Sequence, residues 1–144
     1  MIKENQRLLN QLNVLSDGVL VFAAMLLAYW VRFHLFPGTV SFPFRSFVWL
    51  GLAAVVLCLG TYAVAGLYAS YRAVRFYKEA QTLFLATVLD TLILITALFV
   101  FRLNEMSRWM LVAFCVLAYG MLVCKRAALR MTLRHYRSLG YNQK

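Results

Sequence analysis

One acidic residue, Asp90, stands near the middle of a long apolar stretch, where its carboxyl group has few polar neighbours. About ten residues, or roughly 15 Å of helix, separate Asp90 from either end of that stretch. Such a residue serves in proton or substrate coupling, in a contact with another subunit, or as a satisfied carboxyl that fixes helix packing. Thr87 and Thr91 offer hydroxyl partners in the same stretch, and we expect Tyr62 or Tyr119 to reach it from neighbouring helices.

A second acidic residue, Asp17, lies only about five residues inside another apolar stretch, close to the charged end of that stretch. We expect Asp17 to pair with Arg7, or with Lys125 and Arg126 at the end of the last apolar stretch. Its simplest role is an interfacial salt bridge. The alternative is that Asp17 and these basic partners position a lipid phosphate.

Aromatic and basic side chains alternate in the segment that follows the second apolar stretch, namely Tyr68, Tyr71, Arg72, Arg75, Phe76, Tyr77 and Lys78. In a helix, several of these side chains share one face. Rings at headgroup depth with cations toward the phosphates are typical of a membrane surface. The segment connects two apolar stretches, so its nearest anion is a lipid phosphate, and we expect no nucleic-acid partner.

Basic residues recur every four positions at the end of the last apolar stretch, where Arg126, Arg130 and Arg134 fall on one side of a helix. A generic attraction to anionic lipids explains this pattern, and a specific contact with polyprenyl phosphate is the sharper alternative. The residues predicted to contact the headgroups are Arg72, Arg75, Lys78, Lys125, Arg126, Arg130 and Arg134.

The sequence contains no set of residues that predicts a catalytic or metal site. His34 and His135 fall in segments expected on opposite sides of a membrane, and there is no glycine-rich phosphate loop, HEXXH or CXXC motif. The cysteines, Cys58, Cys115 and Cys124, are odd in number and lie in apolar stretches, where a thiol is inert. We therefore expect no catalytic residue, no metal ion and no cofactor in this chain.

The elements that must position these residues are helices of membrane-spanning length. Apolar residues make up 63% of the 144-residue chain and charged residues 14%, against about 45–50% and about 25% in a soluble domain. About 20 helical residues cross the ~30 Å hydrocarbon core. A soluble bundle would show a polar stripe every three or four residues, which residues 47–67 lack. We predict an all-α membrane protein with one domain, residues 1–144, and helices near 12–31, 47–67, 80–101 and 109–130.

The connections and their charges predict the topology. Short connections place consecutive helices side by side and antiparallel, as an up-down bundle. Of the fifteen Lys and Arg residues, only Arg32, Arg45, Arg102 and Arg108 fall in the first and third connections. The other eleven fall in the N-terminal segment, the second connection and the C-terminal tail. The positive-inside rule therefore places both termini in the cytoplasm.

Several short motifs, taken in order, resemble a known family of membrane enzymes. The motifs are LNVLSD at 12–17, YWVRF at 29–33, GLYASYR at 66–72, Lys78-Glu79, Ser107-Arg108 and RHYRSLGYN at 134–142. In order and spacing they resemble the N-terminal membrane region of the bacterial polyprenyl-phosphate hexose-1-phosphate transferases. Undecaprenyl-phosphate glucose phosphotransferases of capsule and exopolysaccharide synthesis are typical members.

This resemblance implies transfer of a sugar 1-phosphate from a nucleotide sugar to polyprenyl phosphate. In the family, that chemistry belongs to a C-terminal domain with an Asp-Glu pair that binds Mg²⁺, and this chain lacks that domain. The tail from Arg137 to Lys144, with a helix stop at Gly140, is interpreted as a linker. We therefore expect an anchor and assembly domain in the bacterial inner membrane, with anionic lipids, polyprenyl phosphate and further copies of the chain as partners.

Two other interpretations remain open. The first is a small four-helix transporter of lipophilic cations or lipid-linked sugars, in which Asp17 or Asp90 couples transport to protons. The second is a structural membrane protein that recruits a partner. Transport activity, and its loss when each aspartate is replaced by asparagine, would distinguish the first interpretation from the anchor.

Overall fold

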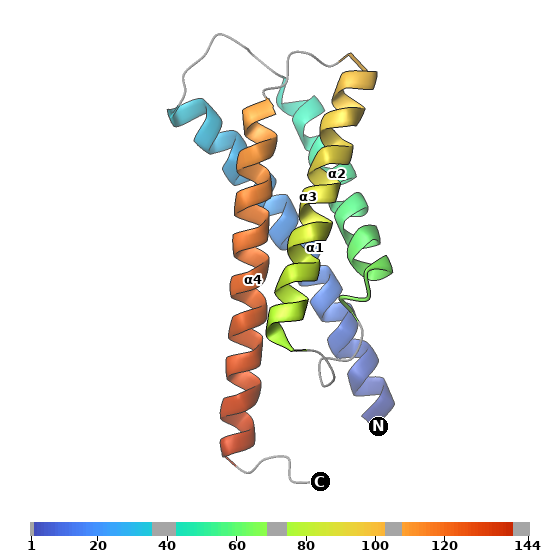
Figure 1. The fold of residues 1–144 in the computed structure, drawn as a ribbon, viewed down its shortest axis with the longest axis vertical. Coiled ribbons are helices and arrows are strands. Elements are labelled where there is room, and N and C mark those ends of the chain that lie inside the picture. Colours follow the sequence, from blue (N-terminus) through green and yellow to red (C-terminus); the bar gives the residue numbers. More distant parts are fainter. Residues whose placement is uncertain (1, 36–42, 69–74, 103–107, 140–144) are drawn as a thin grey trace.

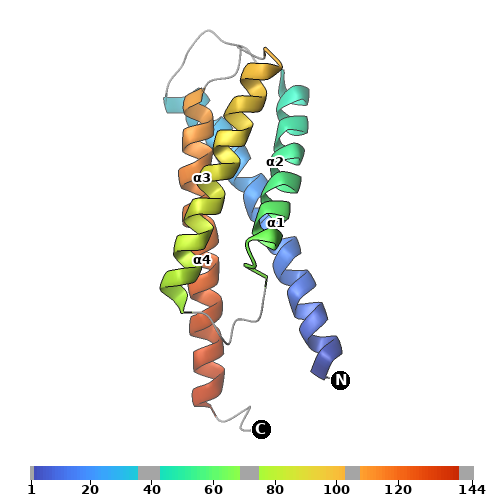
Figure 2. The same ribbon diagram turned by 45° about the vertical axis from the view of Figure 1, so that its right-hand side comes forward.

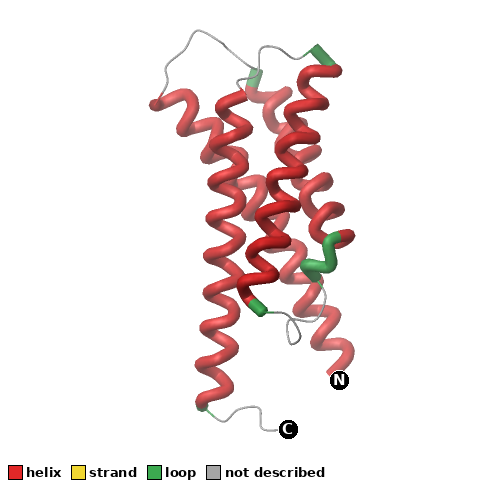
Figure 3. Tube along the Cα trace, viewed as in Figure 1, coloured by secondary structure: helices red, strands yellow, loops and turns green. Residues whose placement is uncertain are grey.

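The computed structural model contains four long helices and describes residues 2–35, 43–68, 75–102 and 108–139. The helices are α1 (Ile2–Leu35), α2 (Phe44–Val64), α3 (Phe76–Val100) and α4 (Arg108–Ser138). The described residues form no strand, and those outside the helices make short turns at helix ends (Figure 3). The all-helical fold class predicted from the sequence is confirmed.

The helices form a closed ring in which each one packs against two others. α1 contacts α2 and α4, α3 contacts the same two helices, and within the described residues the backbones of the diagonal pairs lie farther apart. Successive helices run in opposite directions, and α1 crosses the bundle obliquely (Figures 1 and 2). One end of the bundle holds the starts of α1 and α3 and the ends of α2 and α4 (Figure 1). We call this end of the bundle the basic end, because Arg75, Lys78 and Arg134 are exposed there.

All four helices are long and apolar enough to cross a membrane, over residues Asn5–Leu35, Phe44–Val64, Phe76–Val100 and Arg108–Tyr136. Only 28% to 39% of the most apolar part of each helix is buried inside the bundle. Most apolar side chains therefore face outward, as in a multi-pass membrane protein, where lipid tails cover them.

The helices differ from their predicted bounds mainly at the basic end. α1 begins at Ile2 rather than near residue 12, and α4 continues to Ser138 rather than stopping near residue 130. Both extensions project beyond the rest of the bundle (Figure 1). Hydropathy marks where a helix enters the membrane, whereas the helix itself continues into polar sequence that has no breaker.

A glycine ends α2 at the basic end. Gly66 has a φ of 75°, which is strained for any residue with a Cβ atom. Its N–H donates to Ala63 O at 3.1 Å, and the N–H of Leu67 donates to Tyr62 O at 3.0 Å. This pair of hydrogen bonds is the Schellman motif. The turn buries Leu67, whose carbonyl oxygen accepts a hydrogen bond from Arg126 of α4.

Two glycines let α1 and α2 pack closely. A Cβ atom at Gly51 would lie 3.1 Å from the ring of Phe22, and one at Gly18 would lie 3.3 Å from Leu59. Small residues at helix contacts are typical of membrane bundles, because association there depends on close packing. The buried core that surrounds these contacts includes Val21, Ala24, Met25, Ala28, Ala54, Cys58, Leu83, Phe114, Ala118 and Leu122.

Candidate functional site

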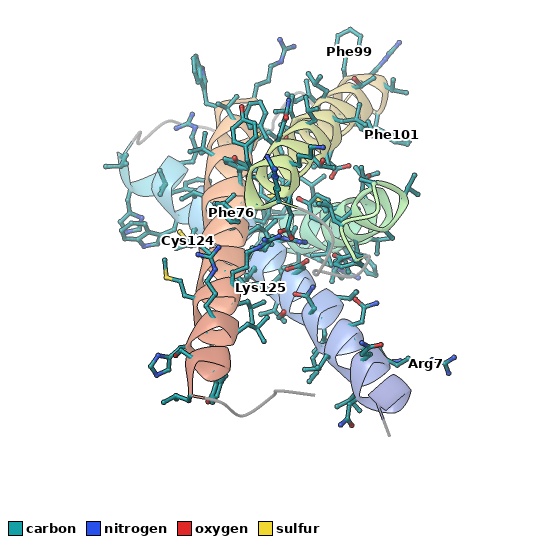
Figure 4. The ribbon with its side chains drawn as sticks, turned by 60° about the horizontal axis from the view of Figure 1, so that its bottom comes forward. Arg7, Phe76, Phe99, Phe101, Cys124 and Lys125 are labelled. Carbon is teal, nitrogen blue, oxygen red and sulfur yellow. The ribbon has the colours of Figure 1, made fainter. Side chains whose placement is uncertain are left out.

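Charged side chains gather inside the bundle at the basic end. We call the following five residues the ionic cluster: Asp17 of α1, Glu79 of α3, and Lys125, Arg126 and Arg130 of α4. In Figure 4, which brings this end forward, Lys125 lies toward the centre of the bundle and Arg7 lies out along the projecting start of α1. The cluster joins Asp17 to Lys125 and Arg126, which are more than a hundred positions later in the chain.

Arg126 is the centre of the cluster, because its side chain is 1% exposed and reaches three other elements. Its guanidinium donates to Asp17 Oδ2 at 3.3 Å, to Leu67 O at 3.3 Å, and to Glu79 Oε1. A guanidinium has five donors in a planar fork, and this geometry lets one side chain serve several acceptors. One residue of α4 thus connects α1, the turn after α2, and α3.

Lys125 completes the α1 side of the cluster. Its ammonium donates to Asp17 Oδ1, to Asn13 Oδ1 at 2.6 Å and to Asn13 O at 3.0 Å. The predicted pairing of Asp17 with Lys125 and Arg126 is confirmed. The predicted alternative, Arg7, is exposed and forms no ion pair with Asp17 in the part of the chain that the structure describes. An acidic residue with no surface exposure is thus matched by two cations.

Glu79 is the member of the ionic cluster that lies on α3, and no role was predicted for it from the sequence. Its Oε1 accepts from Arg126, and its Oε2 accepts from both Nε, at 3.2 Å, and Nη2 of Arg130. The Arg130 guanidinium also lies 5.6 Å from the ring centre of Phe76. Two features of the sequence could have indicated this pairing. Glu79 is an acid in the first turn of α3, where the helix dipole favours a negative charge. Arg126 and Arg130 are four residues apart, so they lie on one face of α4.

The charges of the ionic cluster nearly cancel, since three cations face two carboxylates. Burying a charge is costly unless it is paired and hydrogen-bonded, and removing one partner leaves the other uncompensated. The pairs form only when α1, α3 and α4 take one rotation and one vertical register. The cluster can therefore specify how the helices assemble.

The residues predicted to contact lipid headgroups differ in how exposed they are. Arg75, Lys78 and Arg134 are exposed at the basic end, so their headgroup contact stays a prediction. Lys125 and Arg130 retain 15% and 20% of their side-chain surface, and both are ion-paired. Arg126 differs from the prediction, because it is buried and its donors face protein acceptors rather than lipid. Arg72 and Tyr71 lie outside the described residues.

Asp90 forms a separate polar site between α2 and α3. Its side chain has no exposed surface, and its Oδ1 accepts a hydrogen bond from Thr61 Oγ1 at 2.6 Å. Its Oδ2 is buried and has no hydrogen-bond partner among the described residues. The buried Cys58 thiol also faces the Asp90 carboxyl. Asp90 is thus held by neutral groups, whereas Asp17 is held by two cations.

The partners predicted for Asp90 are engaged elsewhere. The hydroxyl of Tyr62 lies 2.9 Å from that of Thr87, and Thr91 donates to the carbonyl of Thr87 at 2.9 Å. Tyr119 donates to a backbone carbonyl of α3 at 3.5 Å. The prediction of these four partners was wrong, because the rotation of α2 against α3 turns Thr61 toward the carboxyl.

The histidines and cysteines form no further site within the described residues. His34 stacks on Trp30 with ring centres 4.5 Å apart, at the end of α1. His135 lies near the end of α4, so the two histidines are at opposite ends of the bundle. No group of three or more potential metal ligands occurs in the described ranges, and the three cysteines are free.

The fold defines this chain as a multi-pass helical membrane protein. Comparison with known families adds a family assignment. Residues 63–144 match the model of a CoA-binding domain family, CoA_binding_3, and the chain belongs to this family. The domain occurs in proteins related to sugar transferases. No curated protein and no solved structure matches the chain.

The matched segment covers the end of α2, α3, α4 and the tail, so the family name raises the question of CoA. Proteins commonly hold phosphates on glycine-rich turns at helix N-termini. The segment has three glycines far apart in sequence: Gly66, which ends α2, Gly120, inside α4, and Gly140. Its inward-facing cations are bound to Asp17 and Glu79. The described residues of the segment, 63–68, 75–102 and 108–139, therefore do not form a CoA phosphate site.

Proposed function

We propose that this chain is the membrane anchor and assembly domain of a sugar-1-phosphate transferase that loads polyprenyl phosphate at the inner leaflet. Such a reaction would start exopolysaccharide or capsule synthesis. The observation that carries the proposal is the family match, because that domain occurs in proteins related to sugar transferases. The helical bundle adds support, since its charged residues are used to join helices.

In this proposal the basic end of the bundle faces the bacterial cytoplasm. The start of α1 and the end of α4 lie at this end (Figure 1). Arg75, Lys78 and Arg134 are exposed there, and the positive-inside rule supports a cytoplasmic location for such a surface. Nucleotide sugars are cytoplasmic, so a catalytic domain joined after α4 would lie on the side of its substrate.

The same exposed cations support a role in gathering lipid substrate. Phe76 and Tyr77 are 38% and 77% exposed beside Arg75 and Lys78. Rings at headgroup depth next to cations favour anionic lipids, and polyprenyl phosphate has the same phosphate chemistry. We propose that this surface attracts anionic lipids without forming a closed pocket.

The assembly part of the proposal concerns a second copy of the chain. Leu8, Leu12 and Leu15 are 59%, 55% and 68% exposed at the start of α1, among the polar residues Gln6, Asn10 and Gln11. An apolar stripe on the projecting part of a helix is a suitable contact for the same helix of another copy.

The first test is the mass of the native gene product, measured with an antibody against residues 1–13 on membranes of the source cells. A band several times heavier than the 16.5 kDa of this chain is expected for the anchor of a larger enzyme. A band at 16.5 kDa would contradict the anchor and favour the transporter interpretation.

The second test measures the reaction itself. The codons for residues 1–144 are deleted from the native gene, and membranes are assayed for sugar 1-phosphate transfer to polyprenyl phosphate. We expect transfer to fall at matched protein levels. Equal transfer by the intact and shortened proteins would contradict an essential anchor.

A further inference from the structure

Two arginines of the ionic cluster surround one carboxylate in a way that resembles the binding of a phosphate group. Glu79 Oε1 accepts from Arg126, and Glu79 Oε2 accepts from two nitrogens of Arg130. Two guanidiniums that converge on neighbouring oxygens form a donor set that suits phosphate as well as carboxylate. The arrangement is therefore an anion site that an acidic side chain of the same chain occupies.

Burial makes this site more specific than a surface ion pair. The side chains of Arg126, Glu79 and Arg130 are 1%, 7% and 20% exposed. Phe76 faces the Arg130 guanidinium at 5.6 Å from its ring centre, on the side of α3. Among these three described side chains Arg130 keeps the most exposed surface, so an external anion would approach the pair from its side.

We propose that Arg126 and Arg130 form an anion site whose resident anion is Glu79, and that this carboxylate excludes phosphate ligands, CoA included. A phosphate that entered would bring a second negative charge beside Glu79 or leave Glu79 buried and unpaired. Glu79 also has the advantage of an intramolecular ligand, because it is already present at high effective concentration. The family name thus does not predict the ligand of this segment.

The proposal predicts that removing Glu79 opens the site. The full chain is placed in phosphatidylcholine nanodiscs, and its Tm is followed while pyrophosphate is added. The Tm of the Glu79→Ala variant should fall without ligand and rise by roughly 5 °C with saturating pyrophosphate, because a bound ligand stabilises the folded state. The Tm of the wild-type chain should not respond.

Two variants serve as controls for this measurement. Glu79→Ala combined with Arg130→Ala keeps the same vacancy but lacks one guanidinium, so its Tm should not respond to pyrophosphate. Asp90→Ala removes another buried acid from α3, far from the arginines, and its Tm should not respond either. If Glu79→Ala does not fold, Glu79→Ser also empties the site while keeping a polar side chain, and the same saturable rise in Tm is expected.

A separate measurement tests the wild-type chain directly. Equilibrium dialysis with radiolabelled CoA or pyrophosphate should detect no binding by the chain in nanodiscs. Wild-type binding that is lost in Arg130→Ala would overturn the proposal, and so would a folded Glu79→Ala or Glu79→Ser variant whose Tm does not respond to pyrophosphate. Both outcomes are independent of sugar transfer, so they leave the proposed anchor function untouched.

Discussion

Asp17 and Asp90 are both fully buried aspartates on membrane-spanning helices, yet their partners differ in charge. Asp17 is paired with Lys125 and Arg126, within a cluster that reaches all four helices or their ends. Asp90 meets only neutral groups among the described residues, the Thr61 hydroxyl and the Cys58 thiol, and both of them lie on α2. From this difference we expect the charges at the basic end to contribute more to helix assembly than the carboxyl at mid-bundle does.

The largest effect is expected from Arg126→Leu, which removes the donor shared by Asp17, Glu79 and the Leu67 carbonyl. Breaking a buried ion pair by removing one partner costs about 3–5 kcal/mol. The free energy of unfolding, measured by denaturant titration in micelles, should fall by about this amount. Arg126→Lys is the matched control, and it should restore part of the loss because an ammonium replaces the charge but not the fork. A Leu variant as stable as the wild type would show that the cluster does not hold the bundle.

A smaller effect is expected from Asp17→Asn, which keeps the shape and removes the charge. Hydrogen bonds to charged groups contribute about 1.5–3 kcal/mol, and the Asn variant retains weaker ones. Lys125 keeps its bonds to Asn13, which limits the loss. Arg7→Gln, at the exposed residue that was the other predicted partner, should leave the unfolding free energy unchanged. Equal losses in the two variants would contradict the assignment of partners.

Gly66→Ala tests whether the turn after α2 supports the cluster. A left-handed conformation costs a residue with a Cβ atom about 1–2 kcal/mol, and Gly66 has a φ of 75°. The variant should lose stability by about this amount, in the same denaturant titration. Gly120→Ala, inside α4 with no atom within 4 Å of the added Cβ, should be neutral or stabilising. The opposite order would mean that the turn can relax without cost.

The smallest change in stability is expected from Asp90→Asn. Asparagine keeps an acceptor for Thr61, so the loss should stay below about 1 kcal/mol. This variant also tests the transporter interpretation, in which the Asp90 carboxyl carries protons. The anchor proposal expects sugar transfer by the full-length enzyme to be unchanged at matched protein levels. A large loss of stability would show that Asp90 shares the structural role of Asp17.

Much of the fold was predictable because the bilayer imposes simple rules. The long apolar stretches predicted four helices, and the structure confirms four helices long enough to span. The sequence placed Lys125 and Arg126, beside Arg7, among the candidate partners of Asp17, because charges near the same membrane face can pair. The structure shows that Lys125 and Arg126 form the ion pairs. Glu79 was missed because it lies in a charged segment, where an acid looks like an ordinary surface residue.

The partner of Asp90 shows the limit of prediction more clearly. Thr87 and Thr91 are its neighbours on the same helix, and local spacing favoured them over Thr61. Each of these threonines donates instead to the carbonyl four residues earlier. The choice depends on how α2 is rotated against α3, and an apolar helix surface carries almost no signal for that rotation.

The amino-acid sequence by itself determined the number of helices, their apolar lengths and the basic character of one end, because these depend on the composition of contiguous segments. It also contained the charges of the ionic cluster. Tertiary structure alone decided that Arg126 would also join Leu67 and Glu79, and that Thr61 would hold Asp90. Those pairings require the rotation and register of helices distant in sequence, and packing of small and large side chains determines both.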